Sequence, residues 1–207
     1  MGGQPNTSSA AVSLLQAVSE EQLIKEFLSR LGERERGGLK ETPQRVAKAW
    51  KFFCSGMDVD PASVLKTFED GGETYDELLF QANIPLYSNC EHHMQTFFGV
   101  AHIAYVPNGK VVGLSKLTRL AEIFARRLQV QERLTQQIAD ALMDNLAPKG
   151  VGVVLQMRHM CMEARGIQKP GTVTMTSALR GCVKEEHDCR SEFMSMVNTA
   201  SQGLLKL

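Results

Sequence analysis

Hydrophobic residues recur every three to four positions early in the chain, which is the period of an amphipathic helix. Ser19 and Gln22 have the spacing of a capping box, and the apolar stripe that follows it is Leu23, Ile24, Phe27, Leu28 and Leu31. Thr42-Pro43 is typical of an N-cap and a first helical residue. It predicts a second helix with a buried stripe of Val46, Ala49, Trp50 and Phe53. Asp60-Pro61 opens a short third helix.

These patterns divide the chain into three parts. Residues 1–18 are rich in Gly, Ser, Ala and Asn, and we expect them to form a mobile N-terminal arm. Residues 19–72 are expected to form a helical subdomain, which ends at the loop signal Asp70-Gly71-Gly72. Residues 73–207 show a different pattern and are expected to form the second domain.

Extended and helical patterns alternate in this second part. Strands are predicted over residues 78–87, 97–106, 151–162 and 172–179. Between the second and third strands, helical periods begin at Ser115 and Val130, and a short amphipathic segment containing Phe193 follows the last strand. The order is β-β-α-α-β-β, which predicts an α+β fold with an antiparallel sheet.

Composition changes this picture little. Lys plus Arg and Asp plus Glu number 23 each, so no net field favours nucleic acid or an acidic membrane. No apolar run is long enough to span a bilayer, and no N-terminal segment has a secretory pattern. We therefore expect a cytoplasmic protein, in a reducing compartment that suits free thiols. Cys54, Cys182 and Cys189 have no partner motif and are interpreted as structural or surface thiols.

Candidate metal chemistry is concentrated in Cys90-Glu91-His92-His93. Cys90 and His93 have a spacing that lets two side chains of one turn reach one ion, and the distant Cys161 is a candidate third ligand. Three protein ligands with a fourth position open are typical of catalytic zinc, which lowers the pKa of a bound water. His92 is not needed as a ligand, and its ordinary pKa suits proton transfer.

The third predicted strand carries the second half of this candidate site. His159 and Cys161 are expected to point the same way, because residues two apart in a strand share a face. They continue an apolar row of Val151, Val153, Leu155 and Met157. The alternative is that both are core residues at the end of a strand, and that the Cys-x-x-His spacing is structural or accidental.

Four motifs together resemble the GTP cyclohydrolase I family, and the likeness extends from about residue 20 to about residue 198. They are Cys90-Glu91-His92-His93, Val112-Gly113-Leu114-Ser115-Lys116-Leu117, Arg127-Leu128-Gln129-Val130-Gln131-Glu132-Arg133-Leu134-Thr135, and His159-Met160-Cys161-Met162 with Arg165-Gly166. The resemblance implies the tunnelling fold, a homodecamer with active sites at subunit interfaces, and conversion of GTP and water to 7,8-dihydroneopterin triphosphate and formate. That reaction is the first step of pterin biosynthesis.

The resemblance also implies roles for individual residues. It implies that Zn²⁺ is held by Cys90, His93 and Cys161, and that His92 and His159 transfer protons. Glu132 is expected to accept hydrogen bonds from N1-H and the N2 amino group of guanine, a donor pair that adenine lacks. Gln131 is expected as a weaker base contact. The residues expected to contact the triphosphate are Ser115, Lys116, Arg119, Arg165 and, from a neighbouring subunit, Arg45.

Ser115 is also expected to be a helix N-cap, and a helix N-terminus favours an anion. Lys116 and Arg119 are expected to share a face of that helix. Each of these side chains alone is more often a solvated surface group. Arg126, Arg127 and Arg133 are interpreted as structural or interfacial.

Three other functions compete with the zinc enzyme. One is a relative with the tunnelling fold that acts on another purine or pterin. Another is a non-catalytic nucleotide-binding subunit, which the complete set of expected catalytic residues argues against. A third is a structural zinc module that binds nucleic acid, which the balanced charge and the lack of a second ligand pair disfavour. The sequence does not indicate which downstream pathway uses the product.

Overall fold

The computed structural model describes residues 18–34, 36–68 and 74–202. The expected mobile arm, except Val18, and the predicted Asp70-Gly71-Gly72 loop lie outside the described residues. The chain divides into two compact units, Met1–Phe52 and Phe53–Leu207. Within the described ranges, no helix combines the length and the apolar character that crossing a membrane would require.

The smaller unit contains helices α2 (Glu20–Arg30) and α3 (Thr42–Phe53) with a 3-10 turn, η1 (Gly37–Leu39), between them. The predicted capping box is confirmed, because the Ser19 side chain accepts from the Gln22 backbone N–H and the Gln22 side chain accepts from Ser19 N–H. Thr42 is the first residue of α3 rather than its N-cap.

The predicted burial of the α3 stripe is wrong for the described chain, and the apolar stripe of α2 is also not buried. In α2 no residue is buried, and the exposed fractions of Leu23, Phe27 and Leu31 are 48%, 60% and 62%. In α3 the only buried residue is Ala47, and the predicted stripe is half-buried. Periodicity identified the helices correctly, but it does not say whether a partner covers the apolar face.

The larger unit begins with a 3-10 turn, η2 (Pro61–Val64), capped by Asp60. Strand β1 (Thr67–Phe68) then pairs with β4 (Val111–Val112) in a small antiparallel sheet. Val64 and Leu65 pack against the larger hydrophobic core of this unit, called the main core below. By their contacts these two residues therefore belong to the larger unit, although they lie within the predicted helical subdomain. The assignment of residues 19–72 as a helical subdomain and residues 73–207 as a catalytic domain stays a prediction.

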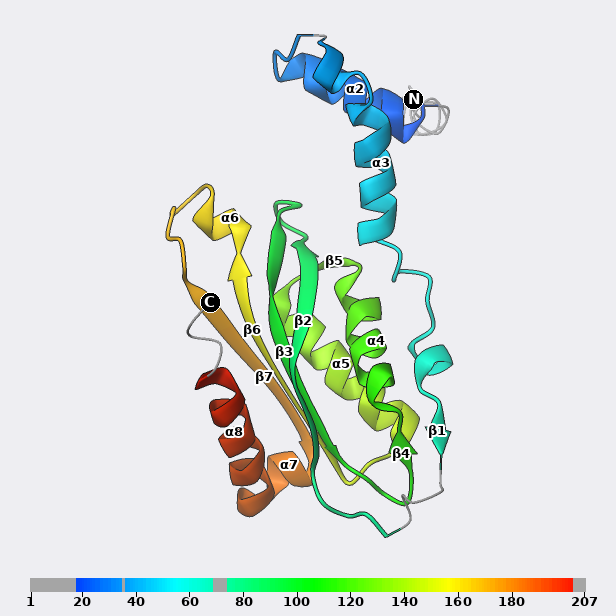
Figure 1. Ribbon diagram of the computed structural model, residues 1–207, viewed down its shortest axis with the longest axis vertical. Helices are drawn as coiled ribbons and strands as arrows, with labels where there is room; N and C mark the ends of the chain where they lie inside the picture. The colour runs from blue at the N-terminus through cyan, green and yellow to red at the C-terminus, as the bar shows by residue number, and fades with distance from the viewer. Residues whose placement is uncertain (1–17, 35, 69–73, 203–207) are drawn as a thin grey trace, which may run out of the picture. The chain divides into compact units, whose positions relative to one another are not determined.

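A five-stranded sheet forms the centre of the larger unit, in the order β5-β2-β3-β6-β7 (Figure 1). Its strands are β2 (Leu79–Cys90), β3 (Thr96–Val106), β5 (Leu128–Gln129), β6 (Gly150–His159) and β7 (Val173–Gly181). All neighbours are antiparallel except β2 and the short β5. The predicted antiparallel α+β order is confirmed. The third strand ends earlier than predicted, at His159, because the chain turns into helix α6 (Met160–Glu163).

Helices α4 (Leu114–Ala125) and α5 (Gln131–Leu146) cover one face of this sheet (Figure 1). The predicted row on β6 points into this main core and is fully buried, and the facing helix residues include Leu117, Leu120, Leu134, Ile138 and Leu142. Each such side chain removed from water contributes about 1.5–3 kcal/mol. This burial holds both helices in fixed positions on the sheet.

The opposite face is covered by α7 (Cys182–Glu185) and α8 (His187–Gln202). Phe193 is fully buried there, and a Cβ placed on Gly152 would come within 2.8 Å of its ring. Gly152 is therefore required for the close approach of α8 to β6. A second, smaller core forms on this face around Phe193, Val183 and Val197.

His102, on β3, faces the same side as this second core and is 0% exposed. Its ring stacks on Phe80, and its Nδ1 accepts weakly from the Asn83 N–H at 3.5 Å. Its Nε2 has no hydrogen-bond partner in the part of the chain that the structure describes. Burial lowers the pKa of His102 below its ordinary value of 6.5. The fold therefore holds this imidazole neutral.

The depressed pKa of His102 predicts a pH-dependent stability. As pH falls below about 6.5, the unfolded chain takes up a proton on His102 before the folded protein does, so this residue's contribution to folding is progressively lost. His102→Gln removes that titration. We expect the urea midpoint of the wild-type chain to fall more between about pH 7.5 and pH 5.5 than that of the variant. His187→Gln, at an exposed position, is the matched control, and parallel pH dependences for all three proteins would contradict the assignment.

Candidate metal centre and active site

The turn that follows β2 places the first two candidate ligands. Cys90 is the last residue of β2, and its backbone N–H donates to the Gln95 carbonyl at 2.8 Å. The Cys90 carbonyl accepts from the Met94 N–H at 2.8 Å, and Met94 has a φ of 51°. This tight turn brings the ring of His93 back to Cys90, with Nδ1 3.9 Å from Sγ.

Cys161 reaches the same place from α6. The prediction that it continues the strand is wrong, because the backbone is helical from Met160. Cys161 nevertheless packs against the main core. One ligand atom each from Cys90, His93 and Cys161 lie within 4.8 Å of one another, which makes them the one candidate metal-binding group in the described ranges.

This donor set fits a divalent ion of borderline softness. Thiolates and an imidazole bind zinc at about 2.3 Å and 2.0–2.1 Å respectively, so small rotations would bring all three atoms to one ion. Burial and then the neighbouring Cys90 raise the pKa of the Cys161 thiol. A bound cation opposes that effect because it stabilises thiolates. Three donors leave a position open, as in catalytic rather than structural sites.

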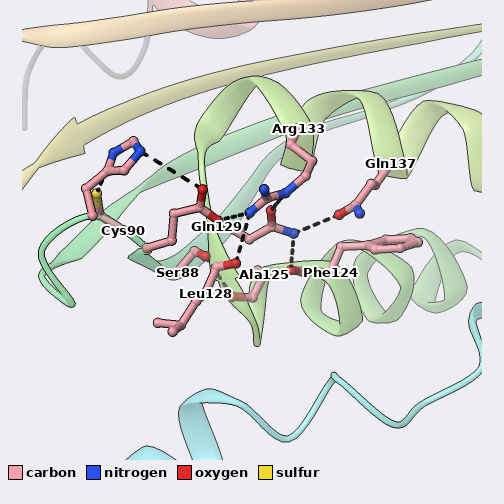
Figure 2. A network of polar contacts seen from close by, with 10 residues as sticks. Ser88, Cys90, Phe124, Ala125, Leu128, Gln129, Arg133 and Gln137 are labelled. Carbon is pink, nitrogen blue, oxygen red and sulfur yellow. Dashed lines mark hydrogen bonds and ion pairs between the residues drawn. The ribbon is translucent and has the colours of Figure 1, made fainter. Parts of the chain in front are cut away.

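Glu91 connects this turn to the start of α5 through an ion pair with Arg133. That hydrogen bond lowers the pKa of the Glu91 carboxyl. Arg133 also donates to the Gln129 side chain at 3.0 Å and to the Leu128 carbonyl at 3.1 Å, and Gln129 donates to Gln137 at 2.8 Å. Figure 2 shows this network running from the region of Cys90 to Gln137.

His92 projects from the same turn but is the more accessible histidine of the pair. Its side chain is 65% exposed, and its Nε2 lies 4.0 Å from Glu91 Oε1. Its Nδ1 also lies 3.9 Å from Cys90 Sγ. His92 is therefore next to the candidate metal centre, beside the Glu91 carboxylate, and is open to a ligand.

His159 is the last residue of β6, two positions before Cys161. Its ring stacks on Phe97 with centroids 4.7 Å apart and planes 6° apart. Its Nε2 lies 2.8 Å from Gln131 Oε1, within hydrogen-bond distance. Burial lowers the pKa of His159, and the charge of Glu132 partly opposes this effect. The structure thus brings Glu132 and His159, which are far apart in sequence, into electrostatic contact.

Gln131 is buried, with 2% of the residue exposed, and its side-chain amide has several hydrogen-bond partners. Its Nε2 lies within hydrogen-bond distance of the carbonyls of Leu155 and Thr174 and of the Thr176 hydroxyl, at 3.0–3.3 Å. These contacts fix the first turn of α5 against β6 and β7. They also orient His159, whereas the expected contact of Gln131 with a base stays a prediction.

Within the larger unit, the expected phosphate ligands do not all lie near the metal centre of their own chain. The charge of Arg165 partly opposes the rise in the pKa of Cys161, which places this exposed arginine near the centre. Ser115, Lys116 and Arg119 lie in the first turns of α4, with Gly113 rather than Ser115 as N-cap. Arg45 belongs to the smaller unit, where it pairs with Glu41.

The distance of α4's N-terminus from the centre follows from two contacts. Gln81 donates to Thr118 at 3.2 Å, so the start of α4 lies beside the start of β2. Ser88 donates to the Ala125 carbonyl at 2.7 Å, so the end of α4 lies beside the end of β2. A strand rises about 3.3 Å per residue, which separates Gln81 from Cys90 by roughly 30 Å.

The sequence assigned no role in the site to Phe97 or Gln129, and it interpreted Arg133 as structural or interfacial without naming Glu91 as its partner. Phe97 stacks on His159, Arg133 holds Glu91, and Gln129 holds Arg133. Arg133 and Gln129 lie within the motif that begins at Arg127. The sequence interpretation assigned residues of this motif to base contacts or to structural charges, and not to a network that holds Glu91. The pairing of Glu91 with Arg133, 42 positions away, has no signal in local spacing.

Comparisons with known proteins agree with the motifs. A model of the family described as GTP cyclohydrolase I matches residues 20–198. A GTP cyclohydrolase 1 of Janthinobacterium sp. (strain Marseille) is 59% identical over 173 residues, which cover 83% of this chain and 87% of that protein. A GTP cyclohydrolase 1 of Mycobacterium avium (strain 104) is 47% identical over 199 residues, covering 95% and 97%.

Two solved structures show a weaker likeness. The archaeosine synthase QueF-Like in the apo form is 16% identical, with a TM-score of 0.40 over 50% of this chain and 93% of that one. A dihydroneopterin aldolase from Burkholderia thailendensis bound to guanine is 16% identical, with a TM-score of 0.35 over 53% and 94%. The structure itself confirms the expected α+β class with an antiparallel sheet, and the tunnelling fold stays a prediction of the motifs. Because the family model and close relatives cover most of the sequence, the chain belongs to the GTP cyclohydrolase I family, and it is an enzyme of that kind.

Proposed function

We propose that this enzyme is a zinc-dependent hydrolase that opens the imidazole ring of GTP at C8, releases formate and forms 7,8-dihydroneopterin triphosphate. The observation that carries the proposal is the convergence of Cys90, His93 and Cys161 within 4.8 Å, beside His92 and His159. When bound, Zn²⁺ would supply a Lewis acid and an activated water at the position that the three side chains leave open.

The two histidines would divide the proton transfers. C8 of guanine is a poor electrophile until N7 is protonated, and His92, exposed beside Glu91, is placed to hold a proton for this step. His159 is held neutral by burial and oriented by Gln131 and Phe97, which suits a base. Later steps, which open the ribose and close the new ring, also move protons and would use the same pair.

Glu132 would select the guanine base. Its carboxylate is exposed in the first turn of α5, and its charge acts on His159. A carboxylate matches the adjacent N1-H and N2 amino donors of guanine, whereas adenine would leave it unpaired. Because Gln131 fixes this helix turn, Glu132 would be presented at a defined distance from the proton-transfer residue.

The triphosphate would be bound across a subunit interface. Lys116 and Arg119 lie at the far end of α4 from the metal centre of their own chain, so a second copy would have to supply them. The same reasoning applies to Ser115, whereas Arg165 would come from the chain that provides the metal ligands. Arg45 would come from a neighbouring subunit because the resemblance to the family implies it. We propose a homo-oligomer, a decamer as in the family, that acts in the cytoplasm at the first step of pterin biosynthesis.

The ligand assignment predicts that metal binding and proton transfer can be separated. Cys161→Ser removes a ligand, so we expect loss of bound zinc, measured by elemental analysis, together with loss of turnover. His92→Ala should keep zinc and lower kcat by about 10²–10⁴-fold, because only a proton-transfer group is removed. Cys54→Ser is the matched control outside the site and should leave both quantities unchanged. Equal loss of zinc in the His92 variant would show that the ligand assignment is wrong.

The role of Glu132 predicts a specific loss of guanine recognition. Glu132→Gln replaces an acceptor of two hydrogen bonds by a group with one acceptor and one donor. We expect kcat/KM for GTP to fall by at least about 10²-fold, the result of one lost charged contact and one mismatched donor. Asp144→Asn, exposed on the same helix, is the control for a lost surface charge. Unchanged GTP turnover in the Glu132 variant, or ATP turnover by the wild type, would count against this role.

The shared-site arrangement predicts complementation between two inactive variants. Cys161→Ser and Lys116→Met, each inactive alone, are co-expressed so that mixed oligomers form. If each site takes Cys161 from one chain and Lys116 from another, about one quarter of random chain pairings contain both residues intact. About a quarter of wild-type activity should therefore return. A mixture no more active than its two components would mean that both residues act within the same chain.

A further inference from the structure

Two cysteines outside the candidate metal centre face each other on the other side of the sheet. Cys182 begins α7, and Cys189 lies in the first turn of α8. Their sulfur atoms are 3.4 Å apart, and the Cys189 thiol donates to Cys182 Sγ. Both are free and half-buried. Neither has any part in the proposed hydrolysis.

The backbone holds this pair in place. Cys182 N–H donates to the Lys149 carbonyl at 3.0 Å, and the Cys182 carbonyl accepts from Glu186 N–H at 2.8 Å. Beneath Cys182, a Cβ placed on Gly150 would come within 2.5 Å of its sulfur. The glycine therefore makes the space that the thiol occupies. Buried Val183 and Phe193 anchor α7 and α8 on either side of the pair.

Both thiols line a surface hollow of about 760 Å³. Besides them, the lining includes one cationic side chain, Lys149, and six carboxylates: Asp76, Glu77, Glu185, Glu186, Asp188 and Glu192. A small oxidant can therefore reach the sulfurs, and the hollow favours a cationic reagent over an anionic one.

We propose that Cys182 and Cys189 form a dithiol modification site, which a positively charged low-molecular-weight disulfide oxidises to an intramolecular disulfide. The thiolate of one cysteine attacks the reagent, forms a mixed disulfide and releases one thiol. The second cysteine then attacks the protein sulfur of the mixed disulfide and releases the other thiol. Two electrons pass from the dithiol to the reagent, and two protons leave the cysteines.

The environment assigns Cys182 as the attacking sulfur. The Cys189 thiol donates its hydrogen bond to Cys182 Sγ, so Cys182 is the acceptor of the pair. Burial, the hydrogen bond and charge of Cys182, and then Glu186 and Glu192 raise the pKa of Cys189 to about 12. Cys189 therefore stays protonated while Cys182 attacks the reagent. It acts second, by attacking the Cys182 sulfur of the mixed disulfide.

The cross-link would join the short helix α7 to α8, which covers the second core. Its ring is short, and the entropy it removes from the unfolded chain would raise the melting temperature by about 5 °C. It lies far from the metal centre, because Gly150 begins β6 and His159 ends it. The disulfide should therefore form whether or not the metal centre is loaded, and the test does not depend on the proposed reaction.

Peptide mapping tests the site directly. The reduced, zinc-loaded full chain is treated with cystamine, a cationic disulfide, quenched with iodoacetamide and digested with trypsin without reduction. Trypsin separates the cysteines into residues 181–184 and 185–190. We expect these peptides to appear as one disulfide-linked species, with a higher melting temperature for the oxidised protein. Recovery of both peptides alkylated would overturn the proposal.

Variants and a second reagent sharpen the result. Cys54→Ser should still form the linked species, whereas Cys182→Ser should abolish it together with the thermal shift. Oxidised glutathione, which is anionic, should react at least about tenfold more slowly than cystamine at low salt, and the difference should shrink at high salt. Equal rates at low salt would refute the preference for a cationic reagent. A Cys189 mixed disulfide in Cys182→Ser, formed as fast as the wild-type cross-link, would refute the assigned attacker.

Discussion

The register of the antiparallel sheet is the constraint on which the candidate site depends. Phe97 lies opposite Ser88 on β2 and His159 on β6. The strand that ends in Cys90 therefore finishes beside the strand that leads into Cys161. A slip of one residue in either pairing would turn every side chain to the other face. The apolar rows of β3 and β6, buried against α4 and α5, fix the register because only one alignment buries them all.

Polar contacts attach the start of α5 to the sheet, so the register of the strands also fixes the position of Glu132. The Gln131 side chain is buried and lies within hydrogen-bond distance of two strands and of His159. A buried amide without partners would cost about 1–3 kcal/mol, so this helix turn has one favoured position. Glu132, the next residue, remains exposed. The first turn of α5 therefore contains one buried side chain that fixes its position, Gln131, and one exposed side chain that can contact a ligand, Glu132.

The two ends of β6 differ in their charged neighbours, because cations and carboxylates are mixed near His159 whereas carboxylates predominate near Gly150. Near His159, Arg165 acts on Cys161, and Arg133 holds Glu91, so cations accompany the candidate metal ligands. Near Gly150, carboxylates surround Cys182 and Cys189. One thiol at each end nevertheless has a raised pKa, Cys161 at one end and Cys189 at the other, and burial is the largest cause in both.

The sequence by itself determined the order of helices and strands in the larger unit, the buried row of β6 and the residues that make up the candidate metal group. The first two follow from local period, whereas the metal group follows from the Cys-x-x-His spacing together with the motifs that resemble the family, which supply the distant Cys161. Only the tertiary structure decided that Cys161 lies in a helix, that Arg133 pairs with Glu91, that Cys182 meets Cys189, and that Lys116 lies far from the metal centre of its own chain. Those facts depend on register and on packing between distant segments, which no local pattern encodes.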